Sequence, residues 1–297
     1  MVRATGVRAN MRMETDAEGK GAYKHMMRAL WSAASGMLAQ QTNVDTIANN
    51  LANVNTTGYR SEKAEFKSLL YQTLQTRTTT ANGEQKPIPA QVGLGTRVSS
   101  MTSSFKEGEM IASESNTAFA IEGDGFFGIQ GVDGEINYTR NGDFFWTNGT
   151  DGLTLATAEG YYVLDREGAP IVVPEGVDTN TVEINSSGEV GYKTVDGNFV
   201  SLDQTIGLWQ FNNPAGLEKV AGTYFRETAA SGNALNETTA GVNLIPSKLR
   251  QNYLESSNVQ VADEMVNLIV AQRAYELNSK AIQAADTMLG QANQLKQ

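Results

Sequence analysis

The sequence predicts an α+β protein in which discontinuous N- and C-terminal helices pair as a coiled-coil-like domain around an inserted antiparallel β-rich domain. Near both ends of the chain, apolar residues recur at alternating steps of three and four, which places them on one helical face. Between the ends, short β-branched and aromatic runs are separated by Asn-Gly and Asp-Gly pairs, which favour tight hairpins. Two adhesive ends around a separate β domain are typical of an assembling subunit rather than of an enzyme.

The composition argues against several classes of function. The chain has 297 residues and a formal net charge of −10, whereas nucleic-acid binding needs a basic face that neutralises phosphates. Cysteine is absent, which excludes disulfides, thiolate chemistry and cysteine zinc sites. The single histidine, His25, precedes the first helical repeat, so we expect no Ser–His triad or histidine metal site in the folded body.

Residues 1–26 are predicted to form a disordered leader. They are polar, mixed in charge and lack the apolar segment of a secretory signal. Met26 and Met27 directly precede the first repeat, which favours a natural start there and an artefactual upstream segment; a start at Met1 with a genuine extension is the alternative. The sequence has no run of about 18 apolar residues, so we expect no membrane span.

Residues 27–58 are predicted to form the N-terminal helix of an inner helical domain, which ends where Gly58 can adopt a left-handed conformation. Asn49, Asn50 and Asn53 are mediocre helix formers, and at a seam between helices their amides would specify register and partner. The apolar stripe of this helix is interrupted by one polar residue and comprises Leu30, Ala34, Met37, Gln41, Val44, Ala48 and Leu51.

Residues 59–95 are predicted to connect this helix to the β-rich domain. Within the connector, residues 62–74 fit either a short helix or an extended segment. Residues 76–90 are rich in threonine and contain proline and an Asn-Gly pair, so we expect an exposed loop. The β-rich body is predicted to span residues 96–242, and an extended return segment is predicted over residues 243–257.

Residues 258–297 are predicted to form the C-terminal helix of the inner helical domain, capped by the side chain of Asn258. Its apolar stripe comprises Val266, Val270, Ala274, Leu277, Ala281, Ala284 and Met288. One such stripe contributes about 10 kcal/mol when it is buried. Ordering about 25 backbone residues costs on the order of 25–50 kcal/mol before helix hydrogen bonds are counted. We therefore expect each helix to need several neighbours, although an ordinary closed bundle is the alternative.

Two motifs resemble functional sites but fit turns better. Residues 123–128 match G-x-G-x-x-G, yet the chain continues as a strand and a turn, without the helix whose N-terminus would hold a pyrophosphate. Asp124, Asp133, Asp143 and Asp151 could suggest calcium ligands or a pair of catalytic carboxylates. Most of them adjoin glycine, as turns require, and they lack EF-hand spacing. We therefore expect no cofactor and no metal.

Several separated segments resemble the flagellar basal-body rod and hook protein family. Residues 48–59, ANNLANVNTTGY, are similar to its N-terminal motif, and residues 257–280 are similar to its C-terminal motif. Between them, IEGDGFF at residues 121–127 and YTRNGDF at residues 138–144 match further family blocks. The resemblance extends over residues 27–297 and includes features typical of the distal rod branch.

The resemblance implies a structural subunit of the flagellar distal rod in the basal body, with no enzymatic role. Unfolded subunits would be exported by the flagellar type III apparatus to the periplasm or cell-wall space. There they would assemble helically into a hollow drive shaft that transmits motor torque to the hook. The implied partners are further copies of the chain, proximal rod proteins, the hook protein and, where the host has an outer membrane, rings around the rod. Neither nucleic acid nor membrane insertion is implied.

In this family the paired terminal helices would form the inner tube and the β body an outer shell. Together with the helical stripes, this implies no catalytic residue but a set of residues for subunit assembly. These are Leu30, Met37, Val44, Asn49, Asn50, Leu51, Asn53, Gly58, Val266, Val270, Arg273, Leu277, Ala281 and Met288.

Two other interpretations stay open. A proximal rod protein or a hook protein would share both helical ends, and a hook would form curved, flexible polymers in place of straight, stiff ones. A secreted β-domain hydrolase, from a different class, would cleave glycans with acids such as Glu122 and Asp143.

Overall fold

The computed structural model describes residues 3–75, 90–131, 134–149, 152–174, 179–194, 199–238 and 244–294. The chain divides into two compact units. Unit 1 comprises Met1–Asn49, Lys63–Thr102 and Ala262–Gln297, and unit 2 comprises Asn50–Glu62 and Ser103–Val261. A helix precedes the β-rich region and another follows it, which confirms the predicted α+β class.

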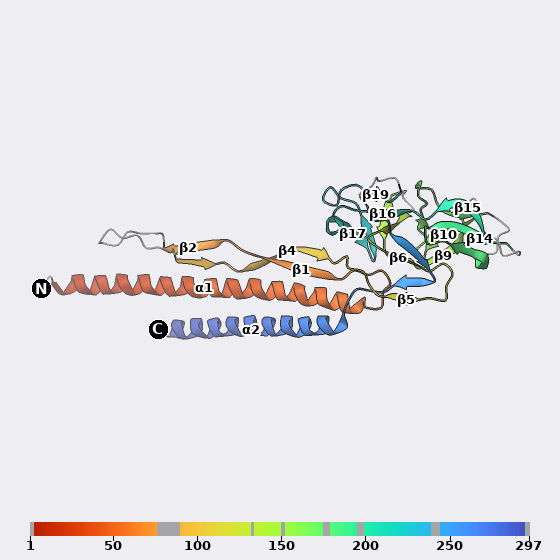
Figure 1. The fold of residues 1–297 in the computed structure, drawn as a ribbon. Helices are drawn as coiled ribbons and strands as arrows, with labels where there is room; N and C mark the ends of the chain where they lie inside the picture. The colour runs from red at the N-terminus through yellow and green to blue at the C-terminus, as the bar shows by residue number, and fades with distance from the viewer. Residues whose placement is uncertain are drawn as a thin grey trace. The chain divides into compact units, whose positions relative to one another are not determined.

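Two long helices dominate unit 1 (Figure 1): α1 (Arg3–Ala52) and α2 (Val261–Gln294). The backbone of α1 is helical from Arg3, in contrast to the disordered leader predicted for residues 1–26. That segment lacks proline and is rich in alanine, methionine, arginine and glutamate, which are good helix formers even without an apolar stripe. At their other limits the helices are shorter than predicted, because α1 ends in turns before Gly58 and α2 begins after Asn258.

The two helices run alongside each other within unit 1 (Figure 1). A Cβ atom at Gly36 of α1 would lie 2.9 Å from Nδ2 of Asn278 on α2. Small side chains are buried on both helices, including Ala39 on α1 and Ala271 and Ala285 on α2. Small residues at such positions allow two helical backbones to approach closely.

The connector after α1 is extended rather than helical, which settles the choice left open for residues 62–74. Four strands form two ribbons. In one ribbon β1 pairs with β4, and in the other β2 pairs antiparallel with β3. Their bounds are β1 (Glu62–Ser68), β2 (Tyr71–Gln75), β3 (Ala90–Gly93) and β4 (Thr96–Ser103). The strands contact α1, since the backbone N–H of Thr96 donates to Oγ of Ser35 at 3.3 Å. The loop predicted over residues 76–90 falls almost entirely outside the described residues.

The main sheet of unit 2 has the strand order β12-β10-β11-β7-β8-β18-β17, with β9, β16 and β19 attached to it. Its registered pairs are antiparallel, as the hairpin signals predicted. Gly134 and Gly152, from two predicted Asp-Gly turns, have φ of 78° and 139°, which glycine adopts without strain. The strands are β7 (Phe126–Gln130), β8 (Ile136–Thr139), β9 (Phe144–Asn148), β10 (Leu153–Thr157), β11 (Tyr162–Val163), β12 (Val172–Val173), β16 (Leu208–Gln210), β17 (Glu218–Ala221), β18 (Tyr224–Arg226) and β19 (Leu235–Asn236).

Smaller sheets complete unit 2. The strands β13, β14 and β15 form a three-stranded sheet, and two strands of the return segment, β20 and β21, pair with β6 and β5. Their bounds are β5 (Met110–Ala112), β6 (Phe119–Glu122), β13 (Val182–Ile184), β14 (Glu189–Lys193), β15 (Phe199–Thr205), β20 (Lys248–Gln251) and β21 (Tyr253–Glu255). Two short 3₁₀ helices, η1 (Thr179–Thr181) and η2 (Pro214–Gly216), lie between strands.

Unit 2 has a hydrophobic core of its own, built largely from aromatic side chains. Phe127 and Phe144 are fully buried and meet edge to face with 5.1 Å between ring centroids. A second cluster gathers around Phe126 and Phe225, whose rings lie 5.7 Å and 5.3 Å from that of Phe105. Each fully buried side chain of this kind contributes roughly 1.5–3 kcal/mol, so the core is sufficient to hold the body together.

Candidate functional site

The helix α2 has two apolar faces. The first is shielded within unit 1 and recurs at heptad spacing, at Leu268, Ala271, Asn278, Ile282, Ala285 and Leu289. The second is the stripe predicted from the sequence. Because an α-helix turns by about 100° per residue, that stripe lies roughly a quarter to a third of a turn away from the shielded face.

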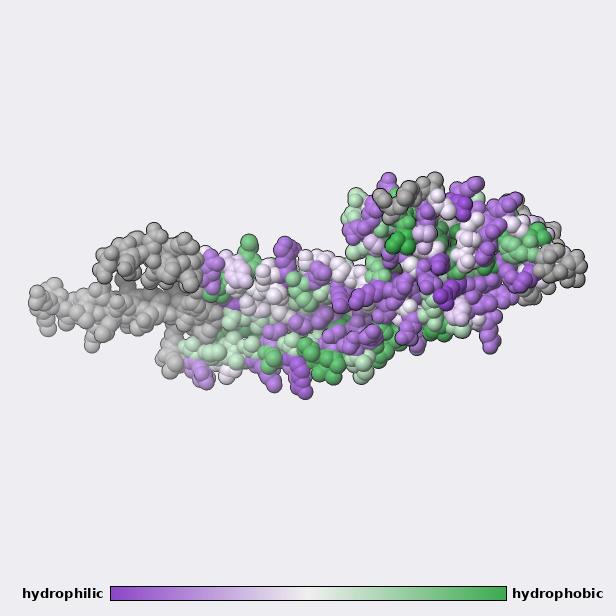
Figure 2. All heavy atoms as spheres, in the orientation of Figure 1, coloured by the Kyte–Doolittle hydropathy of each residue, from purple (hydrophilic) through white to green (hydrophobic). Residues whose placement is uncertain are grey.

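The predicted stripe of α2 is largely exposed. Val266, Val270 and Leu277 expose 60, 62 and 66 % of their surface, and Met288 exposes 53 %. Ala281 of the same stripe is exposed as well. Figure 2 shows apolar residues gathered along the surface of α2. A continuous exposed apolar stripe is unusual for a surface that meets only water, and it is typical of an interaction surface.

Arg273 lies on the exposed surface of α2, where its Nη1 atom is 2.9 Å from Oε2 of Glu276, three residues further along the helix. Both side chains are more than half exposed, so this ion pair contributes little to stability, on the order of 0–1 kcal/mol. The guanidinium is therefore accessible to groups outside the chain.

On α1, the predicted stripe is partly shielded and a neighbouring row is exposed. The predicted apolar residues Leu30, Met37, Val44 and Leu51 are half-buried. Trp31 and Leu38, one residue further along than Leu30 and Met37, are each 67 % exposed. Sequence reasoning missed these two residues, although they are large, apolar and seven residues apart, as a heptad repeat requires.

A hollow of about 350 Å³ opens between the two helices of unit 1. It is lined by Gln41 and Val44 of α1 and by Gln272, Tyr275 and Glu276 of α2. Hollows of this kind, bounded by residues of more than one helix turn, accept single side chains in knobs-into-holes packing.

The asparagines assigned to assembly lie in different surroundings. Asn49 is exposed and Asn53 is half-buried, whereas only 1 % of Asn50 is exposed. The amide of Asn50 donates to the carbonyl of Glu62 at 2.8 Å and accepts from the backbone N–H of Glu62 at 2.9 Å and from the Tyr59 hydroxyl at 3.1 Å. Asn50 thus fixes the start of β1 inside its own subunit.

Gly58 is also held inside unit 2. Its φ of 67° is left-handed, as predicted, and its N–H donates to the carbonyl of Glu255 at 2.8 Å. A Cβ atom there would lie 2.5 Å from the backbone nitrogen of Asn141, so only glycine fits without displacement. Both the conformation and the close contact require glycine.

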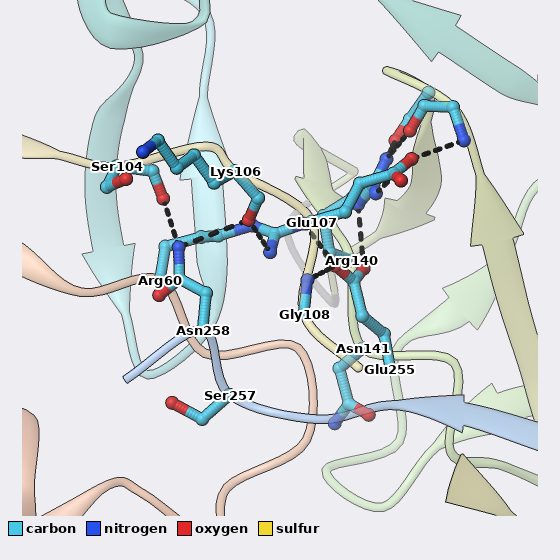
Figure 3. A network of polar contacts seen from close by, with 12 residues as sticks. Arg60, Ser104, Lys106, Glu107, Gly108, Arg140, Asn141, Glu255, Ser257 and Asn258 are labelled. Carbon is cyan, nitrogen blue, oxygen red and sulfur yellow. Dashed lines mark hydrogen bonds and ion pairs between the residues drawn. The ribbon is translucent and has the colours of Figure 1, made fainter. Parts of the chain in front are cut away.

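Glu255, whose carbonyl accepts the N–H of Gly58, belongs to a buried charge network that Figure 3 shows. Glu255, at the end of β21, is 2.7 Å from Nη2 of Arg60 through one carboxylate oxygen and 3.0 Å from Nε of Arg140 through the other. All three side chains are at most 2 % exposed. The same carboxylate also accepts the backbone N–H of Gly108 at 2.8 Å.

Carbonyl oxygens also bind the two guanidinium groups, although Nε of Arg60 is buried without a hydrogen-bond partner among the described residues. Arg60 donates to the carbonyl of Lys106 at 2.7 Å, and Arg140 donates to the carbonyls of Gly123 and Gly125. Burial lowers the pKa of Arg60 below its ordinary value, and the adjacent carboxylate of Glu255 opposes that shift. Two buried cations therefore share one buried anion, which makes Glu255 the residue on which the network depends.

The sequence predicted that Asn258 caps α2. In the structure its side chain instead binds the same region as the charge network. Its Oδ1 atom accepts the backbone N–H of Ser61 at 2.7 Å, and its Nδ2 group donates to the carbonyls of Ser104 at 2.7 Å and Lys106 at 3.1 Å. An isolated sequence shows an asparagine just before a helix, and it does not show the backbone groups before β1 and after β4 that bind its amide.

The network as a whole was missed by sequence reasoning. Arg60, Arg140 and Glu255 are far apart in the chain, and nothing local in the sequence pairs them. The available signal was weak: each is a charged residue inside or beside a segment that resembles the family, with apolar or small neighbours.

Those residues considered for other chemistry that the structure describes are used in other ways. The glycines at residues 123–128 lead into strand β7 rather than into a helix, so they make no dinucleotide cradle. Glu122 is paired with Arg250 at 2.9 Å, and burial raises the pKa of Asp143. Among the described residues, no group of three or more acidic, histidine or cysteine side chains could hold a metal. Asp133 and Asp151 lie outside the described residues.

Comparison with known proteins places the chain in a family. Three family models match it: "Flagella basal body rod protein" at residues 30–60, "Flagellar hook protein FlgE/F/G D1 domain" at residues 120–192, and "Flagellar basal body rod FlgEFG protein C-terminal" at residues 250–295. The flagellar basal-body rod protein FlgG of Borreliella burgdorferi is 46 % identical over 273 residues, which cover 91 % of this chain and 99 % of that protein. The chain belongs to the FlgG family of flagellar basal-body rod proteins.

Other FlgG proteins show similar coverage. That of Caulobacter vibrioides is 40 % identical over 279 residues and that of Bacillus subtilis is 34 % identical over 271 residues, in each case across 91 % of this chain and 100 % of the relative. The chain is therefore a structural component of the flagellar basal-body rod. Among its described residues, no helix is long and apolar enough to cross a membrane.

The FlgG family assignment also bears on the buried network. Arg60 falls in the first matched segment, Arg140 in the second and Glu255 in the third. The three charges thus connect the three segments by which the chain matches its family.

Proposed function

We propose that this FlgG-family chain is a non-enzymatic subunit of the distal rod, and that its terminal helices pair and polymerise to form the inner tube of a hollow drive shaft. The observation that carries this proposal is the second apolar face of α2. A helix that needs only its own subunit has one apolar face, whereas α2 keeps Val266, Val270 and Leu277 more than half exposed beside a shielded face.

Several features support further copies of the same chain as the main partner. Unit 1 has exposed apolar side chains, Trp31 and Leu38 on α1, and a hollow between α1 and α2. Side chains of one copy could therefore enter the hollow of another copy in knobs-into-holes packing. Burying a side chain such as Leu277 contributes roughly 1.5–3 kcal/mol, so repeated contacts along α1 and α2 are strong enough to build a polymer. Ala281 and Arg273, two further assembly residues assigned from the sequence, are also exposed on α2.

The other partners follow from the rod role. We propose contacts with proximal rod proteins at one end and the hook protein at the other, with surrounding rings where an outer membrane exists. Export through the flagellar type III apparatus as an unfolded chain agrees with helices whose apolar faces are covered only when other subunits bind. A hook-like or proximal-rod role is the second candidate, because those proteins share the matched terminal segments.

The test is assembly of the full-length chain with Leu277→Asp, compared with Gln283→Asp. Both substitutions add one negative charge to an exposed position of α2, but Gln283 lies outside the apolar stripe. We expect straight, stiff tubes from the wild-type chain and from Gln283→Asp, seen by sedimentation and electron microscopy. Leu277→Asp is expected to stay monomeric with unit 2 folded.

Normal tubes from Leu277→Asp would refute the role of this stripe. Curved, flexible polymers from the wild-type chain would favour a hook over a rod. Glycan cleavage that is lost in Asp143→Asn would instead revive the hydrolase interpretation.

A further inference from the structure

The chain crosses between its two units four times, after residues 49, 62, 102 and 261. We propose that polar side chains in unit 2 bind the residues at these four crossings to one another, as a collar through which mechanical load enters the body. The collar is defined here as Asn50, Arg60, Glu255 and Asn258 with the backbone groups that they contact. Its mechanical role depends on the proposed function in the rod; its existence as one cooperative structure does not.

The first two crossings are joined by Asn50. Its side chain pairs with both the N–H and the carbonyl of Glu62, at 2.9 Å and 2.8 Å, in the way that a neighbouring strand would. Glu62 is fixed a second time, because its carboxylate is 2.6 Å from Nζ of Lys219 on β17. The chain that leaves α1 is therefore tied to the chain that enters β1, and both are tied to the body.

The third and fourth crossings are joined by Asn258. Its amide accepts from Ser61, beside the second crossing, and donates to the carbonyl of Ser104, beside the third. The backbone N–H of Ser104 also donates to the carbonyl of Ser61 at 2.8 Å. Since Asn258 itself precedes the fourth crossing, one side chain binds three of the four passages.

The charge network anchors this set of contacts to the body. Arg60 contacts the carbonyl of Lys106, which Asn258 also contacts, and it pairs with Glu255 just before the fourth crossing (Figure 3). Glu255 in turn holds Arg140, whose guanidinium donates to the carbonyls of Gly123 and Gly125, just before β7. Pulling on any one passage thus pulls on the main sheet.

The physical argument concerns torsion. A single extended chain resists stretching but turns almost freely about its φ and ψ bonds. The second and third passages already pair with each other as β1 and β4, so the collar contributes the contacts that bind these two to the first and fourth passages. Without those contacts the load would be distributed unequally among the passages. Cross-linked passages share the load, and slipping of one passage would expose buried charges without partners, which is strongly unfavourable. The buried position of the ion pairs also protects them from competition with salt and water.

Hydrogen exchange in the full-length chain tests whether the collar is one cooperative structure. Asn258→Ala removes the side-chain acceptor of the Ser61 N–H, and Asn50→Ala removes the side-chain acceptor of the Glu62 N–H. We expect each variant to speed exchange at Ser61, Glu62 and Ser104 together, by about tenfold, and to leave the amides of β7 unchanged.

Asn236→Ala is the matched control. Its amide also binds backbone groups, the carbonyl of Arg166 at 2.7 Å and the N–H of Thr238 at 3.1 Å, but these lie away from the crossings. Asn258→Asp is a second variant, which keeps the oxygen that Ser61 contacts but places a carboxylate oxygen against the carbonyls of Ser104 and Lys106 in place of the two donated bonds. Faster exchange only at the directly released amide would overturn the proposal, and so would loss of the whole body fold in all three collar variants.

A cellular assay tests the mechanical role. We expect cells with Asn258→Ala or Asn50→Ala to build rods and to swim as fast as wild-type cells in dilute medium, but to lose at least half of their speed in viscous medium. Asn236→Ala should match the wild type in both media. Equal speeds for all variants would refute load sharing. Absence of rods with the wild-type chain would instead refute the proposed function, and the exchange result would still decide whether the collar exists.

Discussion

At the scale of single residues, the most consequential arrangement is one carboxylate shared by two buried guanidinium groups. Surface ion pairs gain little, because water screens them and long side chains must be ordered. A buried pair behaves differently. Its net contribution to the free energy of folding is small, but removing one partner leaves the other charge buried, with neither a counter-charge nor water around it. Without Glu255, Arg60 would lose its ion-pair partner, and Arg140 would keep only the half-exposed carboxylate of Glu107 at 3.9 Å.

The substitution Glu255→Gln tests this asymmetry. It keeps the shape of the side chain and removes the charge, so we expect it to lower the free energy of unfolding of unit 2 by about 3–5 kcal/mol. Urea titration followed by tryptophan fluorescence measures the change, because Trp146 and Trp209 both lie in unit 2.

Glu122→Gln is the control for that measurement. It removes a carboxylate that pairs with Arg250 at 2.9 Å, but about half of each side chain is exposed. We expect a cost of at most about 1 kcal/mol. Equal costs for the two substitutions would show that water reaches the buried network.

The sequence predicted little of this arrangement. Tyr59-Arg60 was visible as part of a motif, but the partner of a buried charge is a long-range property of the fold. Arg60 and Glu255 meet only because β21 returns beside the turn after α1. A single sequence carries no signal for such a pairing.

At the scale of elements, the turn between α1 and β1 sets how the chain leaves the helix. It depends on Gly58, which combines a left-handed φ with a close contact to the backbone of Asn141. Gly222 supplies a comparison, since its φ of 50° is also left-handed but a Cβ atom there would meet nothing within 4 Å.

Alanine substitution at these two glycines separates the cost of a left-handed backbone from the cost of a steric clash. We expect Gly222→Ala to cost about 1 kcal/mol through backbone strain alone. Gly58→Ala is expected to cost roughly 2–4 kcal/mol, because the backbone near residue 141 must move as well. Thermal unfolding of the two variants beside the wild type gives the difference. A smaller cost at Gly58 than at Gly222 would mean that the turn adapts freely.

The heptads predicted the helices, but they did not predict which face of each helix packs inside the subunit and which face stays exposed. Both apolar faces of α2 repeat with the same period, so the pattern alone could not tell which one faces α1. The structure shields Ala271 and Ala285 and exposes the larger Val270 and Leu277. Small residues allow the close approach within the subunit, and the larger ones stay outside it. Likewise, residues 62–74 carry no clear period, and their pairing with residues 90–103 made them strands.

At the scale of the whole molecule, the two units differ in how they are stabilised. Unit 2 has an aromatic core with side chains such as Phe127 and Phe144 fully buried. In unit 1, the described helical residues bury mainly alanines, and its two-stranded ribbons gain little from packing. Isolated helix pairs of this kind are marginal unless neighbours cover them.

We therefore expect the dilute monomer to unfold in two separate steps. Helical circular dichroism should be lost at lower temperature than the aromatic signal of unit 2. Ala271→Asp, which buries a charge in unit 1, is expected to lower the first transition by at least 10 °C and to leave the second unchanged. A single transition shared by both signals, or an equal shift of both, would show that the units unfold together.

The sequence predicted the division into helical ends and a β-rich middle, because periodicity and turn residues are local signals. It did not predict that segments next to both helices, residues 50–62 and 250–261, belong to the body. Their membership depends on hydrogen bonds between distant residues such as Ser61 and Asn258, not on composition.

Unit 2 consists of two segments, Asn50–Glu62 and Ser103–Val261, that alternate with three segments of unit 1, and this arrangement has an evolutionary consequence. Because the body carries its own core and its entering and leaving segments are bonded to each other, it is a self-contained cassette. Such a cassette can grow, shrink or be exchanged while the sequence of the helices stays under separate selection. The same arrangement marks the hairpin loops of unit 2 as places where a tag or an added domain is tolerated, since the ends of those loops are already held by the sheet.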